Sequence, residues 1–214
     1  EYGVHYCSEN GEFAELASLP RLIGKLREAV GNEGMTDLLN NIEMPLTEVL
    51  ASMEHNGIKI TQEGVRDFGK YLTEMIEETQ QLIYDEAGHE FNISSPKQLG
   101  VVLFEEMGLP AKKKTKSGYS TNAEVLEELR SFCPIVDNVL KYRQYTKLNS
   151  TYVTGLLEKV AEDGRIHTSF KQTETRTGRI SSTEPNLQNI PVRTELGAEM
   201  RKFFVADSGK VLID

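Results

Sequence analysis

A long apolar stripe at helical spacing, within residues 61–87, is the feature that most restricts how this chain can fold. Thr61 stands where a helix N-cap is expected, and Gly88 stands where such a helix would stop. The stripe consists of Val65, Phe68, Leu72, Met75, Ile76, Leu82 and Ile83. A helix of this length needs a second long apolar surface to cover that stripe.

A second long helical pattern, residues 134–162, supplies that surface. Two shorter helical patterns lie between the long ones. Ser95 followed by Pro96 is typical of one helix start, and Thr121 with Glu124 fits a capping box for another. We therefore expect an antiparallel pair of long helices with a helical tip at about residues 91–132.

The two ends of the sequence differ in pattern. Near the start, Pro20 is expected to open a helix, and a second helix over residues 36–55 should kink at Pro45 and end at Asn56-Gly57. Residues 58–60 and 165–172 read as extended, and residues 202–214 read as a hairpin around Asp207-Ser208-Gly209. The expected fold class is mainly α with a small antiparallel β part (α+β).

The apolar strand at residues 211–214 stops after four residues, so we expect a chain truncated inside a sheet. Its open strand edges would favour a non-physiological dimer. No apolar run approaches the roughly 18 residues of a membrane span, and the N-terminus lacks the pattern of a signal peptide. We expect a cytoplasmic protein without membrane contact.

Cysteine and histidine usage argues against a fold stabilised by disulfide bonds or by a bound metal ion. Cys7 and Cys133 are expected to be free thiols in a reducing compartment. The four histidines (His5, His55, His89 and His167) are not at metal-ligand spacing. No metal ligand is therefore assigned.

The net charge of −9 is unevenly distributed. Residues 1–90 hold 6 basic and 18 acidic side chains, whereas residues 91–214 hold 18 and 15. The acidic half is interpreted as a solvated helix surface. The second half remains compatible with a polyanionic partner.

Three clusters suit nucleic acid, and each also has an ordinary structural interpretation. Ser95 and Lys97 lie at a helix start, where free N–H groups attract a phosphate; on this motif alone, a plain Ser-Pro cap is the favoured interpretation. Arg143, Lys147, Ser150 and Thr151 would lie along one side of a helix, either as a phosphate track or as a solvated face.

The third cluster is the irregular segment "TGRISSTEPNLQNIPVR", residues 177–193. Arg179, Arg193 and the amides of Asn186, Gln188 and Asn189 can donate to minor-groove acceptors that every base pair presents. Such contacts sense the shape of a base pair without reading sequence. The alternative is a loop held together by its own amides and hydroxyls.

These residues resemble the bacterial DNA polymerase I family (family A DNA polymerases). The resemblance rests on "FNISSPKQLGVVLFEEMGLP", "YRQYTKLNSTY" and above all "GRIHTSFKQTETRTGRISSTEPNLQNIPVRTELGAEMRKFFVA". It implies that residues 36–163 form the thumb, that residues 164–214 begin the palm, and that residues 1–35 are the tail of a preceding exonuclease-like domain.

The resemblance also implies roles for individual residues. Arg179, Asn186, Gln188, Asn189 and Arg193 would touch the duplex near the primer end. Phosphates would be held by a second set, namely Ser95, Lys97, Arg143, Lys147, Ser150 and Thr151. The partner would be primer-template DNA, with dNTP bound only by the full enzyme.

The parent enzyme would add dNTPs by a two-metal Mg²⁺ mechanism. Its first metal-binding aspartate would fall two residues beyond Asp214, so we expect no catalytic residue, no bound metal and no polymerase activity in this chain alone. Two other hypotheses remain open: a non-enzymatic duplex-binding module, and a helical protein-interaction domain that uses the acidic half.

Overall fold

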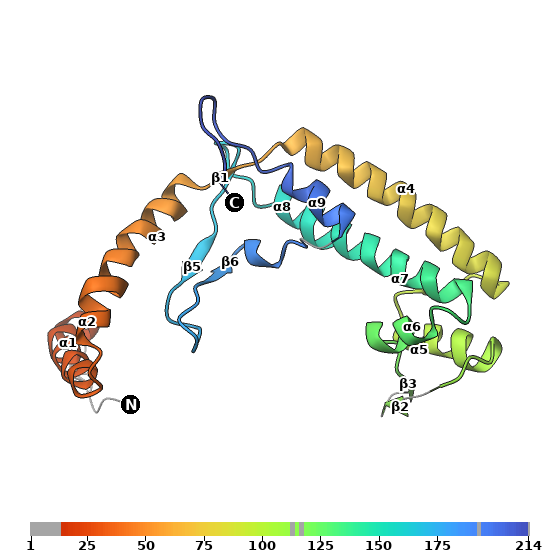
Figure 1. The fold of residues 1–214 in the computed structure, drawn as a ribbon, viewed down its shortest axis with the longest axis horizontal. Helices are drawn as coiled ribbons and strands as arrows, with labels where there is room; N and C mark the ends of the chain where they lie inside the picture. Colours follow the sequence, from red (N-terminus) through yellow and green to blue (C-terminus); the bar gives the residue numbers. More distant parts are fainter. Residues whose placement is uncertain (1–13, 112–113, 116–117, 192–193, 214) are drawn as a thin grey trace. The chain divides into compact units, whose positions relative to one another are not determined.

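The computed structural model describes residues 14–111, 114–115, 118–191 and 194–213, which divide into two compact units (Figure 1). Unit 1 contains the described residues up to Asn56 and Phe170–Ser181. Unit 2 contains Gly57–Ser169 and Ser182–Asp214. Helices predominate and the strands are short, which confirms the predicted fold class. No described helix is both long and apolar enough to cross a membrane.

The described part of unit 1 up to Asn56 is built from helices. They are α1 (Ala14–Asn32), α2 (Thr36–Leu38), the π-helical η1 (Leu39–Glu43) and α3 (Met44–Asn56). Pro20 lies inside α1, so the predicted helix start at Pro20 was wrong. The good helix formers Ala14, Glu15 and Leu16 extend the helix ahead of the proline, which removes only one backbone donor.

The predicted end of the second helix is confirmed. Gly57 has φ +59°, a left-handed conformation that glycine adopts without strain, and α3 stops at the preceding Asn56. At the other end of α3, the π-helical η1 comes directly before Met44 and Pro45. Wider π turns are a known way for a helix to accommodate a local disruption.

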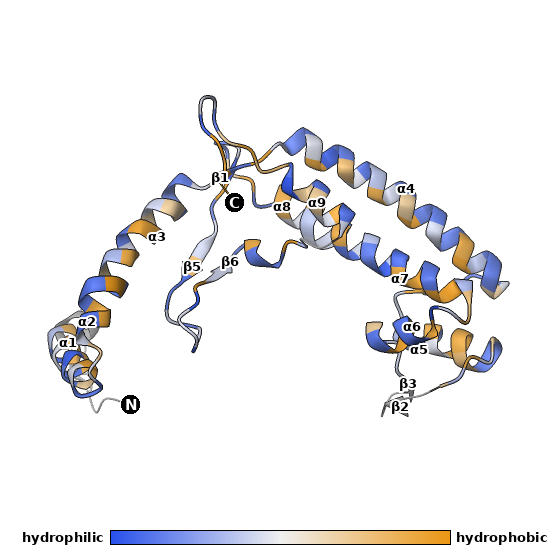
Figure 2. Ribbon diagram, in the orientation of Figure 1, coloured by the Kyte–Doolittle hydropathy of each residue, from blue (hydrophilic) through white to orange (hydrophobic). Residues whose placement is uncertain are grey.

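Large apolar residues lie along the helices of unit 1, whose ribbon carries orange segments in Figure 2, and several of their side chains are exposed. Eight of the described ones are between 43% and 58% exposed: Leu19, Ile23, Met35, Leu38, Ile42, Met44, Val49 and Met53. Exposed apolar residues are one part of what the protein-interaction hypothesis requires, the other being that they form a continuous stripe, and that hypothesis stays a prediction.

Unit 2 contains the two long helices. The first is α4 (Gln62–Ala87); the second is α7 (Pro134–Lys147), continued by the π-helical η3 (Leu148–Thr154) and by α8 (Gly155–Leu157). The second long helix ends at Leu157, before the predicted Glu162. After it, the chain turns back so that Val160 can bridge to Ile166.

Two apolar clusters show that the long helices are antiparallel, as predicted. In one cluster, Val65 and Leu72 from the start of α4 pack with Tyr152 and Val153 of η3. In the other, Ile83 from the end of α4 packs with the start of α7 and with the tip. Burial of these apolar faces stabilises the pair.

The tip between the long helices is also confirmed. It consists of α5 (Pro96–Val101), the π-helical η2 (Val102–Glu106), the strands β2 (Lys114–Thr115) and β3 (Gly118–Tyr119), and α6 (Ala123–Leu129). Ser95 caps α5 as predicted, since its hydroxyl accepts the Gln98 N–H. The predicted cap at Thr121 was wrong, because the Asn122 side chain accepts the Val125 N–H instead.

The β part is small. Strand β1 (Ile58–Lys59) pairs antiparallel with β4 (Arg165–Ile166), and β5 (Ser169–Lys171) neighbours β6 (Ser181–Thr183). The short helices η4 (Leu187–Asn189) and α9 (Glu195–Arg201) follow.

The predicted hairpin near the end of the chain forms only its turn. The Lys210 N–H donates to the Asp207 carbonyl, with 3.0 Å between nitrogen and oxygen. Val211 and Ile213 are 80% and 93% exposed, and residues 211–213 pair with no strand in the described part of the chain. An apolar segment without a backbone partner cannot form a ladder, so the predicted second strand was wrong.

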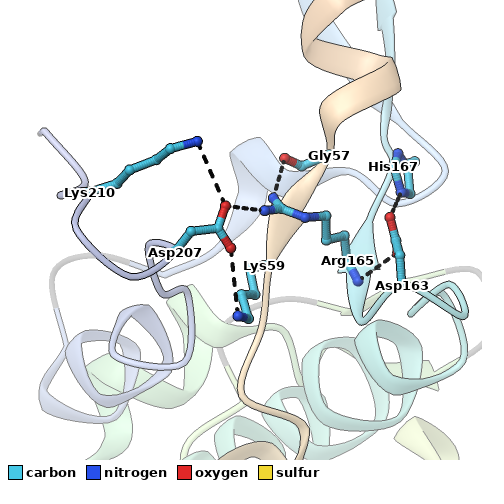
Figure 3. A network of polar contacts seen from close by, with 7 residues as sticks. All are labelled: Gly57, Lys59, Asp163, Arg165, His167, Asp207 and Lys210. Atoms are coloured by element: carbon cyan, nitrogen blue, oxygen red, sulfur yellow. Dashed lines mark hydrogen bonds and ion pairs between the residues drawn. The ribbon is translucent and has the colours of Figure 1, made fainter.

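Asp207 is the centre of a charged network that joins three segments of unit 2 (Figure 3). Its carboxylate pairs with the Arg165 guanidinium and lies 3.6 Å from Lys59 Nζ and 3.9 Å from Lys210 Nζ. Arg165 also donates to the Gly57 carbonyl at 3.3 Å. The hydrogen bond from Arg165, strengthened by the three positive charges, lowers the pKa of Asp207.

We expect Asp207→Asn to reduce stability at neutral pH. The lowered pKa of Asp207 in the folded chain means that its contribution is present above the unfolded value, about 3.9, and is lost as the pH falls through the folded value. Urea unfolding at several pH values should show the two proteins converging in acid. Glu74→Gln, on the exposed face of α4, is the control; an equal deficit at low and neutral pH would contradict the assignment.

Gly69 allows α4 to approach η3 closely. A Cβ at this position would lie 2.7 Å from Val153 Cγ1, which is closer than real contacts. We expect Gly69→Ala to destabilise the chain by about 1–3 kcal/mol, despite the higher helix propensity of alanine. Gly155→Ala is the matched control, since the nearest atom to its Cβ would be 3.7 Å away. Thermal unfolding measures both; a stabilised Gly69→Ala would contradict this packing.

Candidate nucleic-acid interface

Two pockets in unit 2 share one lysine. The first, of about 720 Å³, lies between the start of α5, the segment 119–122 and the face of α7–η3. The second, of about 660 Å³, lies between η3–α8 and the loop at residues 185–189. Lys147 lines both pockets, so they follow one another along the same helix.

Lys147 is the last residue of α7, where α-helical hydrogen bonding changes to the π-helical bonding of η3. Ser150 and Thr151 follow in η3, and their side chains are exposed. Ser150 lines the first pocket and Thr151 lines the second. The structure therefore brings three of the four residues of the predicted track together as exposed polar groups.

Arg143, the fourth residue of the predicted track, is held differently. Its two terminal nitrogens both donate to Thr121, one to the carbonyl and the other to Oγ1 at 3.1 Å. The side chain is half-buried, and burial lowers the pKa of the guanidinium from its ordinary value. Arg143 lines the first pocket but is tied to the tip.

The predicted phosphate site at the start of α5 is only partly assembled. The hydroxyl of Ser95 is used as a helix cap, with 3.4 Å between Oγ and the Gln98 nitrogen. Lys97 is exposed but does not line the first pocket, whereas the neighbouring Ser94 and Pro96 do.

Buried hydroxyls organise the loop that begins at Ser182. Thr168 Oγ1 lies 2.6 Å from Ser182 Oγ and 2.8 Å from the Pro185 carbonyl oxygen. Ser182 Oγ also accepts the Leu187 N–H at 3.1 Å. Thr168 and Ser182 are 7% and 1% exposed, so the loop is fixed from its inner side.

The amides of the same loop lie on its outer side. Asn186, Gln188 and Asn189 are exposed, and Asn186 and Asn189 line the second pocket. The Asn186 side chain accepts the Gln188 N–H at 3.0 Å through its oxygen, which leaves the two amide hydrogens of Asn186 to donate elsewhere. The hydroxyls therefore tie the loop, as the alternative interpretation expected, whereas the amides face outward and their contact with DNA stays a prediction.

Tyr152 is a site residue that sequence reasoning missed. It is 5% exposed within the apolar cluster that contains Val65 and Leu72, and its hydroxyl donates to the Asn189 carbonyl. This contact fixes the amide loop to η3 and forms one wall of the second pocket. A buried tyrosine usually finds a hydrogen-bond partner, which was the available signal.

Two predicted site residues, Arg179 and Arg193, lie outside the described part of unit 2. Arg179 is an exposed residue of unit 1, where its carbonyl accepts the hydroxyl of Thr175. The prediction for Arg193 lies outside the described residues.

The charge of both pockets is positive. Lys147 and Arg143 line the first, and Lys147 and Lys159 line the second. Among the described residues that line either pocket, none is acidic, although the chain as a whole carries −9. Basic groups beside hydroxyls and amides, without carboxylates, suit a partner that carries many negative charges and also offers hydrogen-bond acceptors.

Comparison with known proteins shows the family of this chain. The sequence model of the family described as "DNA polymerase family A" matches residues 62–214, which are more than half of the chain. The chain belongs to DNA polymerase family A. This confirms the resemblance drawn from the sequence motifs.

Relatives in the family are much longer than this chain. DNA polymerase I of Lactococcus lactis subsp. cremoris (strain MG1363) is 47% identical over 205 residues, which are 94% of this chain and 23% of that protein. DNA polymerase I of Bacillus caldotenax is 51% identical over 178 residues, or 82% of this chain and 20% of that protein. The chain thus spans less than a quarter of either of these relatives.

A solved structure shows the same fold. The POL domain of Pol1 from M. smegmatis, in complex with DNA primer-template and dNTP, is similar with a TM-score of 0.84 and 41% identity. The likeness covers 90% of this chain and 34% of that chain.

We expect Tyr152→Phe to loosen the amide loop while leaving the fold intact. Loss of one hydroxyl hydrogen bond costs about 0.5–1.5 kcal/mol, and it should accelerate amide hydrogen exchange at Leu187 and Gln188. Tyr71→Phe, at an exposed position of α4, is the control. Unchanged exchange in Tyr152→Phe would show that the hydroxyl does not hold the loop.

Proposed function

We propose that this chain is the duplex-gripping part of a DNA-directed DNA polymerase that acts in DNA replication and repair. The single observation that carries the proposal is the pair of pockets that share Lys147 and are lined by basic, hydroxyl and amide groups without a carboxylate. Membership of DNA polymerase family A supports it, as does the primer-template bound by the M. smegmatis relative. We place this function in the bacterial cytoplasm.

The residues divide by the part of DNA that each would touch. Lys147, Ser150 and Thr151 would bind backbone phosphates, because a cation and hydroxyls position a duplex without reading its sequence. Asn186, Gln188 and Asn189 would donate to minor-groove acceptors. Arg179 and Arg193 are also proposed to touch the duplex near the primer end, and Ser95 with Lys97 to make a further phosphate contact.

Nucleotide addition with dNTP and Mg²⁺ is proposed for the longer enzyme. The residues present here do not fit that metal site, since the described part of the chain brings no three His, Cys, Asp or Glu side chains together for a metal ion. We therefore derive no catalytic step from this chain and propose that it is inactive alone. We also propose the domain division given above: a thumb over residues 36–163 and the beginning of a palm over residues 164–214.

We expect Lys147→Ala to weaken binding of a mixed-sequence primer-template duplex and to flatten its salt dependence. Loss of one phosphate contact should reduce the slope of log K against log[salt] by about 0.9. Fluorescence anisotropy at salt concentrations between roughly 50 and 200 mM measures both the affinity and its salt dependence.

Lys141→Ala is the matched control. Lys141 also lies on α7, but its Nζ is 2.8 Å from Asp137 and it lines neither pocket. Equal loss of slope in both variants would mean that only total charge matters. Binding by the unmodified chain that is indifferent to salt would refute the proposed phosphate track.

A second candidate function is favoured by the exposed apolar side chains of unit 1. We propose that this face packs against a second copy of the chain in solution, because exposed apolar surface of this kind favours association. Ile42→Glu combined with Val49→Glu should then abolish concentration-dependent dimerisation in sedimentation experiments. A chain that is monomeric before substitution would exclude this candidate.

A further inference from the structure

Arg143 and Thr121 connect the tip to the second long helix across 22 residues of sequence. Thr121 is 5% exposed, and it directly precedes Asn122, the cap of α6. Because Arg143 donates to both the carbonyl and the hydroxyl of Thr121, it holds the backbone and the side chain of the same residue. A planar guanidinium can make such a two-point contact, whereas an ammonium group cannot reproduce its geometry.

The segment that Arg143 holds is also packed from its other side. A Cβ on Gly100 would lie 3.2 Å from Tyr119 Cβ and 3.8 Å from Thr121 Cγ2, so the backbone of α5 lies close to this segment. The Tyr119 ring lies against Phe104, with 5.0 Å between the ring centroids. Residues 119–121 are therefore clamped between α5 and α7.

The clamped segment lines the first pocket, and Lys147 and Ser150 line the same pocket from α7 and η3. The position of Ser120 and Asn122 relative to Lys147 thus depends on the contact between Arg143 and Thr121. If that contact opened, residues 119–122 would no longer be held at a fixed distance from Lys147 and Ser150, although both parts of the pocket would keep their polar groups.

We propose that Arg143 is a positioning residue: it sets the distance between the tip and the phosphate-binding face by holding Thr121, and it does not itself act as a phosphate ligand. This inference rests on the proposed function and assigns Arg143 a role different from the one implied by the family resemblance. The phosphate contacts on this pocket would come from Lys147 and Ser150.

The salt dependence of binding separates the two roles. A direct phosphate ligand contributes about 0.9 to the slope of log K against log[salt], whereas a positioning residue contributes affinity without that slope. We expect Arg143→Ala to bind primer-template duplex severalfold more weakly at every salt concentration, with the slope of the unmodified chain. Lys147→Ala, measured beside it, should lose slope.

Arg143→Lys provides the conservative variant. Lysine binds phosphate as a point charge, so it would restore binding if Arg143 were a phosphate ligand. It cannot replace the two-point contact with Thr121, and we therefore expect Arg143→Lys to remain weak. Restored affinity in Arg143→Lys, or a slope reduced by about 0.9 in Arg143→Ala, would overturn the proposal.

Two measurements without DNA test the contact itself. Amide hydrogen exchange over residues 118–122 should accelerate in Arg143→Ala and in Arg143→Lys but not in Lys147→Ala. Thr121→Val removes the hydroxyl acceptor, and its effect on stability should be non-additive with that of Arg143→Lys. Additive effects and unchanged exchange would overturn the positioning role.

The outcomes distinguish this inference from the proposed function. If the unmodified chain fails to bind duplex, the proposed function fails, while hydrogen exchange still decides whether Arg143 holds the tip. If Arg143→Ala does not fold, Arg143→Lys and Thr121→Val carry the same comparison.

Discussion

The packing of α4 against η3 is the contact on which the rest of unit 2 depends. Gly69 offers no side chain at the point where Val153 approaches, so the two helices lie closer than any larger residue would allow. That approach buries Val65 and Leu72 beside Tyr152, in the apolar cluster against which the loop at residues 185–189 also packs through Leu187. The same tyrosine then reaches the Asn189 carbonyl, so helix packing directly sets the position of the exposed amides.

Local signals in the sequence were sufficient for most of the fold. Ser95 with Pro96, Gly57 and Gly88 each mark a helix end through the chemistry of a few neighbouring residues, and the structure confirms all three. The antiparallel pairing followed from two apolar stripes of similar length. These features need no knowledge of distant contacts, because caps and amphipathic faces are read within a few turns.

The errors arise where a residue's role is decided at long range. Thr121 satisfies the sequence pattern of a cap, but its hydroxyl is taken by Arg143, 22 residues away, and Asn122 caps the helix instead. Residues 211–213 have the composition of a strand, yet a strand also needs a partner. Tyr152 was missed as a site residue because its partner, Asn189, lies 37 residues further along the chain.

The candidate site was predictable in residue type but not in arrangement. Sequence motifs pointed to Lys147, Ser150, Thr151 and the amides, while the structure separates groups that tie the surface together from groups that face outward. The hydroxyls of Thr168 and Ser182 form hydrogen bonds on the inner side of the loop, and these bonds hold the exposed amides in a fixed position. Arg143 stands in the same relation to Lys147: one cation is used to hold the surface, and the other is exposed on it. An acidic chain can therefore present a basic surface, because binding depends on which charges remain exposed at the site and not on their sum.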